Sequence, residues 1–102
     1  MMFSPRLRVK TLLLPTSLDL GNAPDWKERL IGALTLNPVL KLDGSGISHV
    51  TTPGIQILLA AAESAKSKGG KIVLMNPSSA LEAAFDDLGL TQTLREWRAT
   101  HA

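Results

Sequence analysis

The sequence predicts an α/β fold, in which a mixed, largely parallel sheet of four strands packs against three to four helices. Two observations predict it. Segments with the alternating or continuously apolar pattern of strands take turns along the chain with segments that carry the apolar stripe of a helix. Glycine, proline or asparagine separates most of these segments. The order strand, helix, strand, helix, strand, helix is typical of a parallel sheet covered by helices.

Length and composition indicate one domain over residues 1–102, with a core at about 7–90 and a short helical tail at 91–102. Apolar residues make up 44% and charged residues 20%, which is ordinary for a globular protein. The absence of cysteine excludes disulfides and thiolate chemistry. No apolar run has the length of a membrane span or of a secretory signal, so we expect a cytoplasmic protein without membrane insertion.

The first strand is expected at 6–14, where side chains alternate between two faces. One face carries Leu7, Val9, Thr11 and Leu13, and the other carries Arg6, Arg8, Lys10 and Leu12. The basic residues indicate a solvated sheet face. Aromatic residues are few and basic residues are not gathered on one helix, so nucleic-acid binding is not expected. Residues 18–20 could briefly resume extended structure.

A first helix is predicted to begin at Asn22-Ala23-Pro24 and to end at Asn37-Pro38. Its apolar stripe consists of Trp26, Leu30, Ala33 and Leu34. A short strand at 39–42 follows. The glycine-rich stretch 43–46 then lacks the Lys-Ser or Lys-Thr pair of a phosphate-binding loop, which favours a plain turn.

The second helix is predicted from Pro53 to about Lys68. Proline is tolerated in the first helical turn, which places Thr52 at the N-cap. The apolar stripe consists of Ile55, Leu58, Leu59 and Ala62. Gly69-Gly70 supplies a left-handed end to the helix, and a buried strand follows at 71–75.

The last long helix follows Asn76-Pro77-Ser78. Ser79 and Glu82 have the spacing of a capping box, in which each side chain satisfies a backbone N–H of the other residue. The buried stripe is expected to be Leu81, Ala84, Phe85 and Leu88, with Gly89 closing the helix. One or two further helical turns are expected between residues 91 and 97.

No enzymatic site is evident. The two histidines, His49 and His101, lie far apart in the sequence and have no acid at metal-ligand spacing. The adjacent acids Asp86 and Asp87 would point in different directions on a helix and cannot act as a pair. We therefore expect no catalytic residue, no metal site and no cofactor.

The order of the motifs resembles the STAS domain family, which contains bacterial anti-sigma factor antagonists. That family has a strand, a loop ending in Asp-Ser-Ser-Gly or Asp-Thr-Ala-Gly, a helix, a Gly-Gly turn, a strand, then Asn-Pro-Ser and a helix ending in Gly-Leu. The corresponding pieces are Val39-Leu40-Lys41-Leu42, Thr51-Thr52-Pro53-Gly54, Ile55-Gln56-Ile57-Leu58-Leu59, Gly69-Gly70-Lys71-Ile72-Val73-Leu74, Asn76-Pro77-Ser78 and Leu88-Gly89-Leu90. The resemblance spans about residues 12–90.

The resemblance implies a regulatory domain without enzymatic activity, which docks an anti-sigma factor or a histidine-kinase-like protein kinase. It places Thr52 at the phosphoacceptor position, Thr51 where the family has an aspartate and Pro53 where it has a second small residue. The partner surface would consist of His49, Thr51, Thr52, Pro53, Gly54 and Gln56. We expect a monomer or a weak dimer.

Three alternatives remain open from the sequence. The threonine pair could serve only to cap the helix. The chain could be a constitutive accessory subunit of a chemosensory complex or of a phospholipid-transport ABC system. It could also be a small-molecule-binding or enzymatic domain that uses the loop at 43–46.

Overall fold

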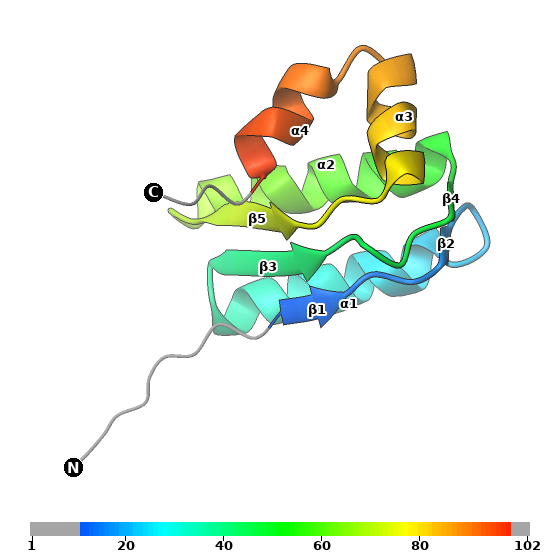
Figure 1. Ribbon diagram of the computed structural model, residues 1–102. Helices are drawn as coiled ribbons and strands as arrows, with labels where there is room; N and C mark the ends of the chain where they lie inside the picture. The colour runs from blue at the N-terminus through cyan, green and yellow to red at the C-terminus, as the bar shows by residue number, and fades with distance from the viewer. Residues whose placement is uncertain (1–10, 99–102) are drawn as a thin grey trace.

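The computed structural model describes residues 11–98 (Figure 1). The described chain consists of short strands and four helices in the order β1 β2 α1 β3 β4 α2 β5 α3 α4. The strands are β1 (Thr11–Leu13), β2 (Ser17–Leu18), β3 (Val39–Asp43), β4 (His49–Val50) and β5 (Lys71–Met75). The helices are α1 (Ala23–Leu36), α2 (Thr52–Ser67), α3 (Ser79–Asp87) and α4 (Thr91–Trp97). None of these helices is long and apolar enough to cross a membrane.

The predicted α/β fold with parallel strands is confirmed, but the sheet is divided. The main sheet has the order β1-β3-β5, and β2 pairs separately with β4. Every pairing within the described residues is parallel, whereas a single mixed sheet of four strands was expected from the sequence. Pro15 and the turn at 44–48 separate the small sheet from the ends of β1 and β3, because proline has no N–H to donate to a sheet ladder.

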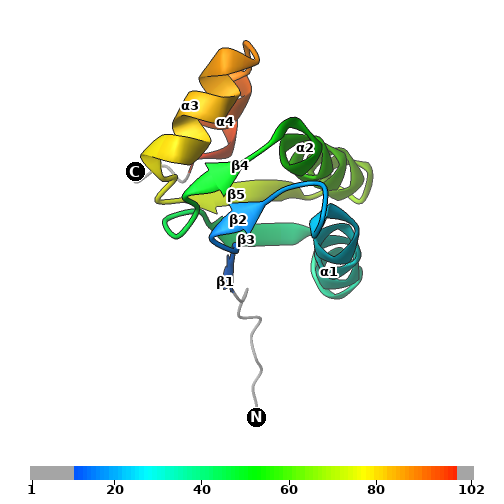
Figure 2. The same cartoon turned by 90° about the vertical axis from the view of Figure 1, so that its right-hand side faces the viewer.

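Helices cover the sheet unequally on its two sides. Helices α1 and α2 lie side by side on one face, and α3 and α4 stand on the other side next to β5 (Figures 1 and 2). The core between these layers is entirely apolar among the described residues, and Phe85 and Leu58 are completely buried in it. The rings of Phe85 and Trp97 meet edge to face with centroids 5.4 Å apart, which fixes α4 against α3.

The inward face of β1 is the opposite of the predicted one. Leu14 is buried and Leu12 half-buried, whereas Leu13 is 63% exposed. The alternation is set by pairing with β3, because Leu12 lies beside the fully buried Leu42. The three consecutive leucines fit either alternation locally, so only this long-range register decides between them. The other residues of the predicted strand, 6–10, lie outside the described residues.

The ends of α1 and α2 follow the sequence signals. Helix α1 begins after Asn22 and ends before Asn37 as predicted. Helix α2 ends in a Schellman motif, in which Gly69 has a φ of +79° and the Gly70 N–H donates to the Ala65 carbonyl at 2.8 Å. The buried side of α2 is centred differently from the prediction. Its buried residues are Gly54, Ile55, Ile57, Leu58, Ala61 and Ala65, whereas Leu59 and Ala62 are half-buried.

The start and the stripe of α3 also differ from the prediction. Ser78 is the N-cap, since its hydroxyl accepts from the Leu81 N–H at 3.1 Å, and Ser79 is the first helical residue. Leu88, expected in the buried stripe, is 45% exposed because it already lies in the turn that closes the helix at Gly89. Leu81 and Phe85 are fully buried as predicted.

Candidate functional site

The candidate site lies where the parallel strands end. The small β2–β4 sheet sits beyond the carboxyl ends of β1 and β3, and α2 begins directly after β4 (Figures 1 and 2). Open α/β sheets bind their ligands and partners preferentially at this end, because the loops and the helix N-termini gather there. Five of the six residues predicted for partner binding belong to β4 or to the first two turns of α2, and the sixth, Thr51, directly precedes the helix.

Thr51, and not Thr52, is the N-cap of α2. Its backbone is extended, with φ −110° and ψ 172°, while its carbonyl accepts from the Ile55 N–H at 3.0 Å. Thr52 and Pro53 are therefore the first two helical residues. Helix α1 has the same spacing, with Asn22 as the cap and Pro24 two residues later. The predicted cap was wrong by one residue because proline occupies the second helical position, not the first.

The two threonine hydroxyls have opposite surroundings. The Thr51 hydroxyl oxygen is buried and has no hydrogen-bond partner within the described residues. Thr52 is exposed at the first position of the helix. An enzyme or partner that approaches this end of the molecule can therefore reach the hydroxyl of Thr52 but not that of Thr51.

Gly54 holds the start of α2 against β2. A methyl group added at this glycine would lie 2.4 Å from the Leu18 carbonyl oxygen and 3.0 Å from the Leu18 carbonyl carbon. The Thr51 N–H donates to the same Leu18 carbonyl at 3.0 Å. The helix can approach this closely only because glycine has no side chain. Gly54 is buried and so lies beneath the predicted surface, whereas His49, Thr52 and Gln56 are exposed on it.

The exposed part of the site carries little charge. Gln56 follows Thr52 by one helical turn and faces the same way. The first turn of α2 contains no acidic residue. Beside it, the N–H groups of Ser48 and His49 donate to the Thr16 carbonyl at 2.8 and 3.1 Å, which ties β4 to the β1–β2 segment. We call the exposed residues Thr16, Ser48, His49, Thr52 and Gln56 the Thr52 surface.

The neighbouring loop at 43–46 forms a turn and not a phosphate cradle. The Gly44 N–H donates to the Met75 carbonyl at 2.9 Å, and the Ser45 N–H donates to the Asp43 carboxylate at 2.9 Å. That backbone hydrogen bond, with a further one from the Ser45 hydroxyl, lowers the pKa of Asp43. A phosphate loop needs free N–H groups and no carboxylate beside them, so this loop does not suit a nucleotide. No group of three potential metal ligands lies together within residues 11–98.

Sequence reasoning missed the contact of Gly54 with β2 and the two-residue strand β4. The first leaves a signal, because Gly54 is the third residue of a predicted helix, where glycine is unfavourable unless packing requires it. The second leaves none, since β4 is recognisable only by its pairing of His49 with Ser17.

Comparison with known proteins gives one family and one fold. The sequence pattern of the STAS domain matches residues 6–102. No curated protein matches the chain significantly. Solved structures that are 17 to 22% identical to this chain establish its fold alone.

Among those solved structures is the unphosphorylated form of the anti-sigma factor antagonist SpoIIAA. It has a TM-score of 0.72 at 17% identity, over 96% of this chain and 85% of that one. The phosphorylated form of the Bacillus cell fate determinant SpoIIAA has a TM-score of 0.67 at 17% identity, over 90% and 81%. The murine anion transporter Slc26a9 has a TM-score of 0.74 at 22% identity, over 88% of this chain but only 16% of that one.

Proposed function

This chain belongs to the STAS domain family, and we propose that it is a regulatory protein of the anti-sigma factor antagonist type. In this proposal it docks a protein kinase that is also an anti-sigma factor, in the cytoplasm, through the Thr52 surface. The same kinase phosphorylates Thr52 and thereby releases itself. The chain itself catalyses no reaction.

The exposure of Thr52 beside the buried hydroxyl of Thr51 carries the proposal. A phosphate on the first residue of α2 would stand at the positive end of the helix dipole, where the fold tolerates it. It would also bring about −1.5 to −2 charges to a surface that otherwise carries almost none. Such a change can abolish docking without unfolding the domain.

The comparisons support the proposal in two ways. SpoIIAA is described as an anti-sigma factor antagonist, and its structure has been solved both with and without phosphate. Its fold matches this chain over most of both lengths.

The residues of this chain depart from the family motif at two positions. Thr51 lacks the acidic group of the motif, and Pro53 has no N–H to offer a phosphate.

The test is phosphorylation by the partner kinase with ATP, followed by intact mass and peptide mapping. We expect a single phosphate on Thr52, which is lost in Thr52→Ala. Thr51→Ala is the matched control, because its hydroxyl is buried and the variant should still accept one phosphate. In a binding assay with the same kinase, Thr52→Glu should bind more weakly than the unmodified protein. Equal binding by Thr52→Glu would refute the switch.

A second function is favoured by the likeness to a transporter. The structure of the anion transporter Slc26a9 contains a region with the fold of this chain as a small part of its length. In this alternative the chain is a constitutive accessory subunit of a transport or chemosensory complex, and Thr52 contacts the partner without modification. It predicts stable co-purification with that partner and an intact mass without phosphate in cells.

A further inference from the structure

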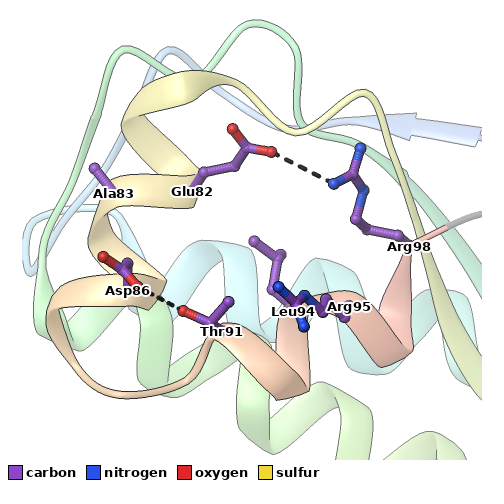
Figure 3. Close-up of a pocket in the computed structure, with 7 residues that line it drawn as sticks. All are labelled: Glu82, Ala83, Asp86, Thr91, Leu94, Arg95 and Arg98. Carbon is purple, nitrogen blue, oxygen red and sulfur yellow. Dashed lines mark hydrogen bonds and ion pairs between the residues drawn. The ribbon is translucent and has the colours of Figure 1, made fainter.

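A hollow between α3 and α4 is separate from the Thr52 surface and shares none of its residues. Its volume is about 370 Å³, which is the size of a small-ligand pocket. Glu82, Ala83 and Asp86 line it from α3, and Thr91, Leu94, Arg95 and Arg98 line it from α4 and its C-cap (Figure 3). The side chain of Leu94 is buried and forms an apolar floor.

The two arginines of the hollow are weakly engaged. Arg98 and Glu82 form an ion pair at 3.6 Å, with both side chains about half exposed. An exposed pair of this length contributes little and exchanges readily for a better partner. No carboxylate within residues 11–98 lies at ion-pair distance from Arg95. Arg95 and Arg98 are three residues apart, so they are neighbours on one side of the helix end.

The carboxylates of the hollow are less available than the arginines. Asp86 accepts a hydrogen bond from the Thr91 hydroxyl at 2.7 Å, which holds it toward the start of α4 (Figure 3). Glu82 is the one carboxylate of the hollow that is paired with an arginine. Two guanidinium groups therefore stand beside an apolar floor, with a single carboxylate competing for them.

We propose that this hollow binds a small organic anion, a carboxylate or a phosphate monoester attached to an apolar body. The guanidinium groups of Arg95 and Arg98 form paired hydrogen bonds to the anionic oxygens, a geometry that suits planar arginine side chains. The apolar body lies on Leu94 and Ala83. Binding of the anion releases Glu82 from Arg98.

The test is a titration of the full chain, in buffer without phosphate, followed by the amide NMR signals of Ala83 and Leu94. The probes are phenyl phosphate, phenylacetate, inorganic phosphate and the cation phenethylamine. We expect saturable shifts with the first two probes and much weaker ones with the last two. Arg95→Ala and Arg98→Ala should each weaken the binding of phenyl phosphate by about tenfold or more, as expected for lost hydrogen bonds to a charged group.

Glu82→Gln should change the affinity for phenyl phosphate in the opposite direction. It removes the competing carboxylate and should strengthen binding by about two- to fivefold, the range expected for an exposed ion pair. Arg29→Ala is the matched control, because Arg29 lies on α1 over the ring of Trp26 and should leave binding unchanged. Absence of saturation, equal binding of phenethylamine or of inorganic phosphate, or weaker binding by Glu82→Gln would each overturn the proposal. Thermal unfolding of each variant establishes that it remains folded.

Discussion

Replacing Gly54 by alanine tests whether α2 lies as close to β2 as the structure indicates. The added methyl group would lie 2.4 Å from the Leu18 carbonyl oxygen, whereas ordinary contacts begin at 3.4 Å. The helix and the strand would have to separate by about 1.0 Å, the difference between these two distances. The neighbour is backbone that cannot rotate away, so the helix start must move.

The expected loss of stability follows from two opposing effects. Forcing a methyl group into a packed contact costs about 3 kcal/mol at the upper end of the usual range, and the rigid backbone places this contact there. Alanine has a higher helix propensity than glycine, which offsets about 1 kcal/mol of that loss. The free energy of unfolding should therefore fall by about 2 kcal/mol, which corresponds to about 10 °C in the melting temperature of a domain of this size.

Gly32→Ala is the matched control, measured by circular dichroism during thermal and urea unfolding. Gly32 also lies within a helix, but a methyl group there would meet nothing within 4 Å. This variant should gain about 1 kcal/mol and melt about 5 °C higher. If both variants were equally stabilised, the close approach of α2 to β2 would be refuted, and with it the positioning of Thr52 by Gly54.

Three further predictions concern single side chains. Ser78→Ala should lower the free energy of unfolding by about 1 kcal/mol through loss of the N-cap, whereas Ser79→Ala should leave it unchanged or slightly higher. Urea unfolding distinguishes the two, and the reverse order would place the cap at Ser79. Thr51→Val should raise the free energy of unfolding by about 1 kcal/mol, because it removes a buried hydroxyl without a partner; a loss would mean that the hydroxyl is bonded. The pKa of Asp43 is lowered from 3.8 in the folded protein, so the ionised carboxylate stabilises the fold above pH 3.8. This stabilisation is lost as the pH falls through the lower pKa of the folded state. The amide oxygen of Asp43→Asn can still accept from the Ser45 N–H but does not titrate. On acidification through this pH range, the variant should therefore lose less free energy of unfolding than the parent protein. An identical loss would contradict the role given to the Asp43 carboxylate.

Local signals in the sequence were sufficient for the long elements. Proline, asparagine and glycine mark the ends of α1 and α2, because these signals act within one or two helical turns. The apolar spacing identifies the buried side of α1 but only part of that of α2, where Ile55 and Leu58 are buried and Leu59 and Ala62 are half-buried. The N-cap of α2 was misplaced by one residue, although the spacing from Asn22 to Pro24 in α1 is the same as that from Thr51 to Pro53. In both helices the N-cap lies two residues before the proline, so the spacing in α1 indicates Thr51 as the cap of α2.

Contacts between distant segments could not be predicted from the sequence. The inward face of β1 depends on the pairing of Leu12 with Leu42, and β4 exists only by its pairing with β2. The packing of Trp97 on Phe85 joins α4 to the core, and the hollow between α3 and α4 exists only once these two helices have docked. The sequence singled out Thr52 only as a candidate, and the structure distinguishes its exposed position from the buried hydroxyl of Thr51.

The parallel pairing of all described strands governs the order in which the protein can form. Thr11 pairs with Lys41, Ser17 with His49 and Val39 with Lys71, so each pairing joins residues about 30 positions apart. No two of the described strands can pair as a local hairpin, because a helix lies between the partners of every pair and has to form first. During synthesis the central strand β3 gains its second neighbour only when β5 has left the ribosome. We therefore expect the chain to fold slowly for its size and in a single cooperative step, with no stable half-domain along the way.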